Sequence, residues 1–167
     1  MLSAAQQERF ARHLLLDDLG GEGQERLVAS AAAIDLPEAF AQVARWAVRY
    51  LAASGVGTLV LRGPWAAECA RECADRWPET RVLFSGTAAA GAVLIDAAGA
   101  EAAADPDGRI AIAAEPRDAA EAASVGALAA LEALKRIVSA GRPAAQPLRF
   151  AAAEEPPEGR REGSAMR

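Results

Sequence analysis

The stretch RYLAASGVGTLVL (residues 49–61) contains the end of a helix, a glycine turn and a short strand, and it decides the class of fold. Gly55 follows the last helical position, where a residue with a left-handed backbone commonly ends a helix. TLVL (58–61) has the apolar composition of a buried strand. A helix that leads directly into a buried strand is typical of an α/β protein.

The same alternation of helices and strands extends along the chain in both directions. Short apolar runs predict further strands at 29–36, 81–84, 92–96, 109–113 and 147–152. Capping residues and helical periodicity predict helices at 3–16, 38–54, 64–76 and 119–140, with a short helix near Gln24. We therefore expect an α/β fold with a Rossmann-like, mainly parallel sheet, helices on both of its faces and an N-terminal helical arm.

The length of 167 residues is that of one compact domain. We expect this domain to comprise residues 1–153, with residues 1–28 as the helical arm. Residues 154–167 (EEPPEGRREGSAMR) are polar and contain prolines, which predicts a disordered tail.

Composition excludes several classes of function. Eighteen basic residues against 23 acidic ones give a net charge of -5, whereas nucleic-acid binding requires a basic face. No apolar run reaches the roughly 18 residues that span a bilayer, and the N-terminus lacks the apolar core of a signal peptide. We expect a cytoplasmic protein that contacts neither nucleic acid nor membrane.

Three stretches together resemble the ThiF/MoeB/HesA family, the bacterial relatives of ubiquitin-activating enzymes. They are ERFARHLLLDDLGGEGQERLVAS (8–30), RYLAASGVGTLVL (49–61) and GALAALEALKRIVSAGRPAAQPLRF (126–150), and they occur in the family's order. The resemblance implies a Rossmann-like fold and a dimer. It also implies an activity that uses ATP and magnesium to adenylate the C-terminal glycine of a ubiquitin-like sulfur carrier.

The positions that match the family's nucleotide site carry different residues here. IDLPEAF (34–40) replaces the glycine-rich phosphate loop, in which backbone N–H groups contact the phosphates. Pro37 removes one donor, and the carboxylates of Asp35 and Glu38 repel a triphosphate. The second strand is followed by Arg62 where the family has an acidic residue that binds the ribose.

The family's metal-binding and cysteine motifs are also incomplete. VLIDAAGA (93–100) keeps Asp96 but has Gly99 where the family's magnesium aspartate would be. The catalytic cysteine and the paired zinc motifs have no counterpart. Cys69 and Cys73 are two ordinary helix thiols in our interpretation, with a redox or metal role as the alternative. We expect no bound cofactor, with ATP and magnesium required only if the chain is an active enzyme.

The arm keeps one functional position of the family. Arg12, with Arg9 one turn before it, matches an arginine that reaches across the family's dimer to the partner's ATP as an arginine finger in trans. The alternative is that both arginines are solvated helix charges paired with Glu8 or Asp17.

Two further residues are candidates for an interface. Gln24 belongs to the glycine-containing turn beside the arginines. Trp46 falls near the polar stripe of its predicted helix, and an exposed tryptophan often marks a contact surface.

These features favour a non-catalytic protein that acts as a pseudo-subunit or partner of an adenylating enzyme or of a ubiquitin-like sulfur-carrier system. It would form a homodimer, or a heterodimer with an active homologue. One alternative is a divergent but active ATP-dependent adenylyltransferase that activates the C-terminus of a ubiquitin-like protein. Another is a homodimeric scaffold or binding module that retains only the fold.

Overall fold

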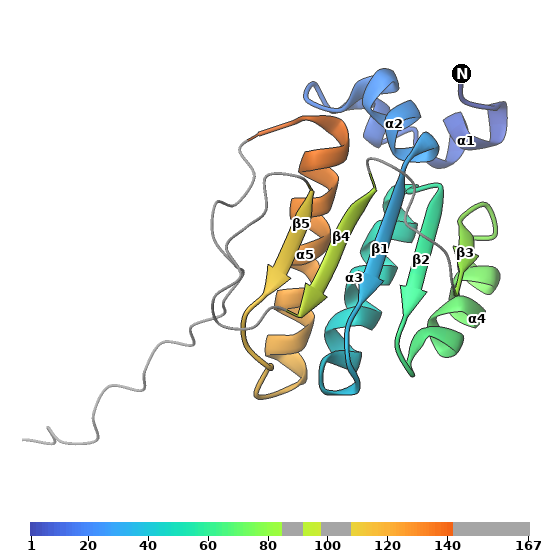
Figure 1. Cartoon of the computed structure of the whole chain (residues 1–167). Helices are drawn as coiled ribbons and strands as arrows, with labels where there is room; N and C mark the ends of the chain where they lie inside the picture. Colours follow the sequence, from blue (N-terminus) through green and yellow to red (C-terminus); the bar gives the residue numbers. More distant parts are fainter. Residues whose placement is uncertain (85–91, 98–107, 142–167) are drawn as a thin grey trace, which may run out of the picture.

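A five-stranded parallel sheet forms the centre of the computed structural model, which describes residues 1–84, 92–97 and 108–141. The strand order is β3-β2-β1-β4-β5 (Figure 1). The strands are β1 (Ala31–Asp35), β2 (Thr58–Arg62), β3 (Arg81–Leu83), β4 (Val93–Ala97) and β5 (Arg109–Ile112). The predicted α/β class and parallel sheet are confirmed. The predicted strand at 147–152 and the predicted tail at 154–167 lie outside the described residues.

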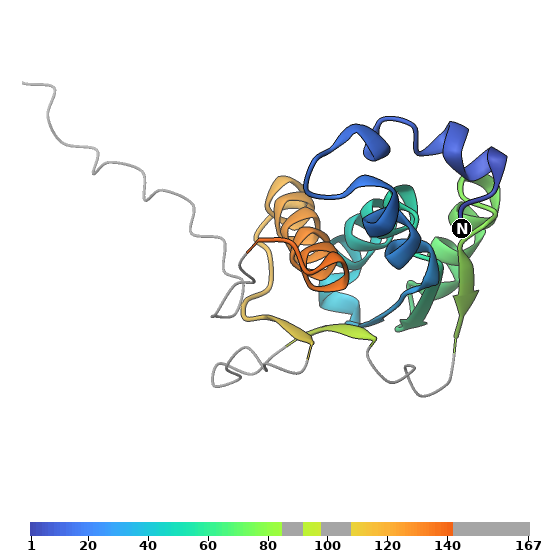
Figure 2. The ribbon, with the colours of Figure 1, turned by 90° about the horizontal axis from the view of Figure 1, so that it is seen from above.

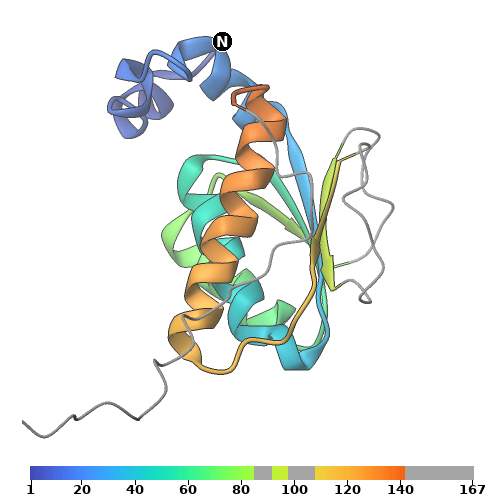
Figure 3. The ribbon, with the colours of Figure 1, turned by 90° about the vertical axis from the view of Figure 1, so that its left-hand side faces the viewer.

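Three long helices follow strands and cover one face of the sheet (Figure 3). They are α3 (Ala41–Ser54), α4 (Ala66–Arg76) and α5 (Ala119–Val138), and a 3-10 turn, η2 (Glu38–Phe40), precedes α3. The expectation of helices on both faces is not met by the helices of the described part of the chain. It came from the general rule that parallel sheets are covered on both sides. No helical pattern in the sequence between 81–84 and 109–113 supported it.

The hydrophobic core lies between the sheet and this helical layer. Side chains alternate along each strand, and those that face the helices are almost completely buried: Ile34, Leu59, Leu61, Ile95 and Ile112. Each such side chain contributes about 1.5–3 kcal/mol when it leaves water. Buried alanines on α3 and α5 let these two helices pack closely together. The high alanine content is therefore partly a packing feature.

The end of α3 has the glycine cap that the sequence predicts, and the start of α5 has a cap that the sequence analysis did not name. Gly55 ends α3 with a φ of 92°, and its N–H donates to the Ala52 carbonyl oxygen. Asp118 begins α5 by accepting a 2.8 Å hydrogen bond from the Glu121 N–H. The helix predicted over 119–140 ends two residues earlier, at Val138, because Ser139 already adopts the left-handed conformation.

The N-terminal arm lies at the amino ends of the strands and extends across the end of the helical layer (Figures 1 and 2). It comprises α1 (Ala4–Arg9), the 3-10 turn η1 (His13–Leu15) and α2 (Gly20–Ala29). Ser3 and Gln6 form the predicted capping box. The predicted first helix, however, ends at Arg9 instead of near residue 16. The break follows from tertiary packing, because the chain turns at Phe10 and buries that ring to 1% exposure. None of the described helices is both long and apolar enough to cross a membrane.

Candidate functional site

The carboxyl ends of three neighbouring strands bring together three residues singled out in the sequence. β1 is central, and its register places Asp35 opposite Arg62 of β2 and opposite Asp96 of β4. The chain leaves β1 toward β2 on one side and leaves β4 toward β5 on the other. Such a switch point is where open α/β sheets bind ligands. Gly99, another of the predicted positions, lies outside the described residues.

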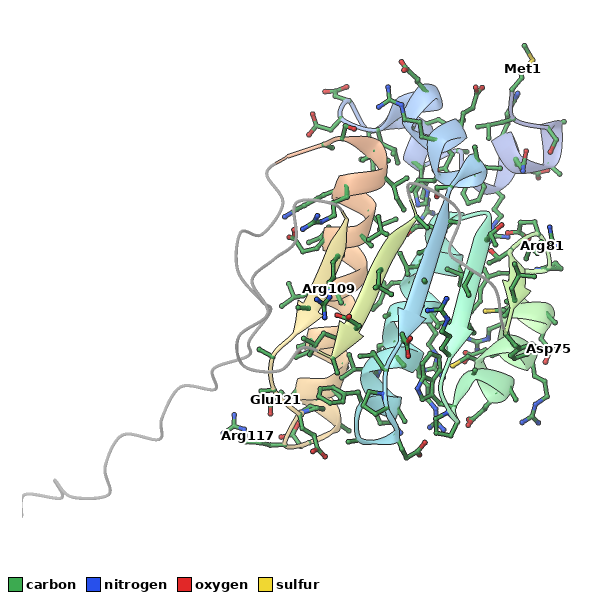
Figure 4. All side chains as sticks on the ribbon, in the orientation of Figure 1. Met1, Asp75, Arg81, Arg109, Arg117 and Glu121 are labelled. Carbon is green, nitrogen blue, oxygen red and sulfur yellow. The ribbon has the colours of Figure 1, made fainter. Side chains whose placement is uncertain are left out.

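The charges at this edge are paired with one another. Arg62 Nη1 lies 3.4 Å from Asp35 Oδ2. Arg109 Nε lies 3.0 and 2.8 Å from the two carboxylate oxygens of Asp96, and Figure 4 shows Arg109 on β5 beside β4. Both oxygens of Asp96 are thus engaged, so a cation there would compete with a guanidinium. Within the described ranges, no group of three or more His, Cys, Asp or Glu side chains is arranged to hold a metal ion.

The turn between β1 and α3 is held by a tryptophan that the sequence analysis did not single out. Trp65 is 2% exposed, and its Nε1 donates to the Leu36 carbonyl oxygen over 2.8 Å. Gly63 permits this contact, because it has a φ of 142° and a Cβ there would lie 2.4 Å from Trp65 Nε1. Pro37 supplies no N–H group, and the Glu38 side chain is exposed. Side-chain packing therefore fixes this turn. The turn also carries the Glu38 carboxylate, whereas a phosphate-binding turn offers N–H donors.

The arm is joined to the domain by Gln24, which was predicted to lie at an interface. Its side chain is fully buried within the chain, so it presents no surface to another molecule. Its Nε2 donates to the Ser54 carbonyl oxygen and its Oε1 contacts His13 Nδ1, each over 3.0 Å. Because the amide oxygen can only accept, His13 Nδ1 must carry the hydrogen. Gln24 thus connects α2, η1 and the end of α3.

The two predicted arginines of the arm have different surroundings. Arg9 forms an ion pair with Glu79, and its guanidinium lies 5.1 Å from the centre of the Phe10 ring. Partial burial lowers the pKa of Arg9. The expected alternative partners, Glu8 and Asp17, are not the ones that Arg9 contacts. Arg12 is exposed, and no side chain of the described part of the chain pairs with its guanidinium.

Trp46 packs within the helical layer more than the sequence suggested. It is half-buried, and the Arg49 guanidinium lies 5.0 Å from the centre of its ring. Glu72 of α4 holds that guanidinium through a 2.9 Å hydrogen bond to Arg49 Nε. The neighbouring Tyr50 is the more exposed aromatic residue, at 46%. A contact role for Trp46 stays a prediction.

Cys69 and Cys73 are buried, unpaired thiols on α4. Burial, with a smaller contribution from neighbouring charges, raises the pKa of Cys69 to about 12 and that of Cys73 to about 11. Both are therefore protonated at neutral pH, which disfavours metal binding and nucleophilic chemistry. The geometry supports their interpretation as packing residues.

Comparison with known proteins gives partial similarities. No known protein-family profile matches the chain. A stretch of 60 residues is 40% identical to the SAMP-activating enzyme E1 of Haloferax volcanii. The stretch covers 36% of this chain and 21% of that enzyme. The solved structure of TcdA (CsdL) is similar over 59% of this chain and 50% of the TcdA chain, with 20% sequence identity and a TM-score of 0.46. The sequence match supports the resemblance to activating enzymes over the matched stretch, and it spans about a fifth of the relative's length.

Proposed function

We propose that this chain is a non-catalytic relative of the enzymes that activate ubiquitin-like proteins, and that it acts through protein contacts. In this role it is a pseudo-subunit, paired with an adenylating homologue or with a ubiquitin-like sulfur-carrier system. The observation that carries the proposal concerns the carboxyl ends of β1, β2 and β4 with Asp35, Arg62 and Asp96, which we call the strand-end edge. A nucleotide would bind at this edge in such a fold. Its charges form ion pairs with each other, and its first turn is held by Trp65.

Tight ATP binding at this edge would require favourable contacts for the phosphates. Phosphate sites depend on several N–H donors and a favourable helix N-terminus. Here Asp35 and Glu38 flank the turn, and Pro37 lacks a donor. Adenylation of a carboxylate by this chain alone would place a triphosphate against these two carboxylates.

The arm supports a role in trans. Arg12 is exposed and carries a charge that no described side chain neutralises. A guanidinium in this state is available to the phosphates of a nucleotide that a second protein binds. In the proposed complex, Arg12 stabilises the charge that develops when the partner adenylates its carboxylate substrate and releases pyrophosphate.

The test begins with a tagged pull-down from the native host and mass spectrometry of the recovered proteins. With the recovered adenylating enzyme, ATP–pyrophosphate exchange is then measured in the presence of the wild-type chain, Arg12→Ala or Arg81→Ala. Arg81 is the matched control, because it is also an exposed arginine and lies on β3 (Figure 4). We expect Arg12→Ala to abolish stimulation while size-exclusion chromatography still shows the complex. Equal stimulation by both variants would exclude the arginine-finger role.

The sequence match to the SAMP-activating enzyme favours one competing function, a divergent but active adenylyltransferase. Calorimetric titration of the chain with ATP and magnesium separates the two. An affinity in the range of ordinary substrate constants, tighter than about 1 mM, would favour the active enzyme. Heats indistinguishable from dilution would favour the pseudo-subunit.

A further inference from the structure

A groove lies between the N-terminal arm and the last turns of α5. Its walls are mainly aliphatic and come from Leu16, Leu19, Leu27, Leu131, Leu134 and Val138. The volume is about 530 Å³, which is within the range of roughly 300–1,000 Å³ that binding pockets occupy. We call this feature the arm groove. It lies at the opposite end of the strands from the strand-end edge.

Exposed leucines gather around the arm groove. Leu16 and Leu131, which line it, are 54% and 47% exposed, and the adjacent Leu15 is 82% exposed. A single exposed leucine needs no explanation, whereas several around one concavity are typical of a site that another molecule covers. These exposed leucines therefore continue the apolar wall of the groove onto the surface.

The rim of the arm groove is acidic. Asp17 and Asp18 line the groove and are exposed, and neither carboxylate has an ion-pair partner within the described part of the chain. Among the described residues of the lining, the basic ones are His13 and Lys135, and the Lys135 ammonium group lies 2.6 Å from Glu132. The local field thus favours a cationic ligand, because complementary charge guides and orients association.

We propose that the arm groove binds a peptide segment of a partner protein that combines aliphatic side chains with at least one arginine or lysine. The aliphatic side chains fill the space between Leu16 and Leu131, and the basic residue pairs with Asp17 or Asp18. A second copy of this chain fits less well, because each copy has a net charge of -5 and two copies repel each other. The inference rests on the proposed function, in that the chain works through protein contacts.

The test is a selection from a phage-displayed library of random peptides on the immobilised full chain. We expect the enriched peptides to share two aliphatic residues and one or more basic residues. The best peptide is then labelled with a fluorophore, and its affinity for each variant is measured by fluorescence polarisation.

Two pairs of variants test the two parts of the site. Asp17→Asn with Asp18→Asn removes the acidic rim, and Asp75→Asn with Glu115→Gln is the control with the same change of charge at exposed positions elsewhere. We expect about threefold to tenfold weaker binding for the first pair and no change for the control. Leu131→Asp should weaken binding at least about tenfold. Leu128→Asp, on the same helix at 42% exposure but outside the groove lining, should not.

Several results would overturn the proposal. They are the absence of any enriched peptide, enrichment of peptides without basic residues, or equal binding to Leu131→Asp and Leu128→Asp. A chain that is dimeric and becomes monomeric only on Leu131→Asp would assign the groove to a second copy instead. Peptide binding and stimulation by Arg12 are separate readouts, so the groove can fail while the pseudo-subunit role holds, and the reverse.

Discussion

Replacing Gln24 with methionine tests whether one buried amide holds the arm against the domain. Methionine has nearly the length of glutamine but removes both polar groups. The Ser54 carbonyl oxygen then loses the N–H of Gln24, and the His13 ring loses its acceptor, each at a present separation of 3.0 Å. The change thus isolates hydrogen bonding from packing volume.

The expected loss follows from these two contacts. A hydrogen bond contributes about 1 kcal/mol net, and a polar group left buried without a partner costs about 1–3 kcal/mol. Gln24 is fully buried, whereas His13 is half-buried and can turn toward water. We therefore assign most of the penalty to the Ser54 carbonyl group. The free energy of unfolding should fall by about 2–3 kcal/mol.

Urea denaturation followed by tryptophan fluorescence measures this loss, with Gln42→Met as the control at an exposed position of α3. Hydrogen exchange should accelerate first in residues 4–16, because these residues depend on the Gln24 contact. A loss below about 0.5 kcal/mol, or exchange that accelerates equally throughout the chain, would show that the arm is held by something other than this amide.

Two further predictions concern buried groups. Because burial raises the pKa values of Cys69 and Cys73 to about 12 and 11, Ellman's reagent should label them at pH 8 only after unfolding. Rapid labelling of the native chain would contradict this burial. The unfolded thiols ionise near 9.0, so the free energy of unfolding should also decline as the pH rises from about 9 toward 12. Trp65→Phe leaves the Leu36 carbonyl oxygen without its donor and should lower the free energy of unfolding by about 1–3 kcal/mol. An equal loss in the half-buried control Trp46→Phe would refute that explanation.

The strands and the main helices could be predicted from the sequence because their signals are local. Leu59, Val60 and Leu61 are apolar and form the buried interior of β2, and Gly55 marks the end of α3 by its conformational freedom. The break at Phe10 could not be predicted in this way. ERFARHLLL (8–16) continues a helical pattern, and the chain turns because the Phe10 ring packs against Gly55, a contact far along the sequence.

Polar residues were the least predictable part of the arm. Gln24 follows a glycine-rich turn, so its type and position suggested a surface. Its burial depends on Ser54, 30 residues later, and on His13, 11 residues earlier. Arg12 and Arg9 have the same residue type and lie in one segment. Among the described residues, however, an acidic partner meets only Arg9, and it comes from the turn after α4. Such differences arise from the tertiary fold alone.

The strand-end edge could be predicted in part from the sequence and in part only from the fold. Sequence order places Asp35, Arg62 and Asp96 at strand ends, and a parallel sheet then brings those ends to one edge. The sheet register adds Arg109, which begins β5 and reaches the carboxylate of Asp96 on the neighbouring strand. Glycines introduced into the turn between β1 and α3 would therefore not by themselves create a nucleotide site. Trp65 would still hold that turn, and Arg109 would still pair with the Asp96 carboxylate. The missing N–H donor at Pro37 is a feature of the sequence, whereas the pairing of the charges is a feature of the fold. The two are independent, and together they support the proposal that the chain acts through protein contacts.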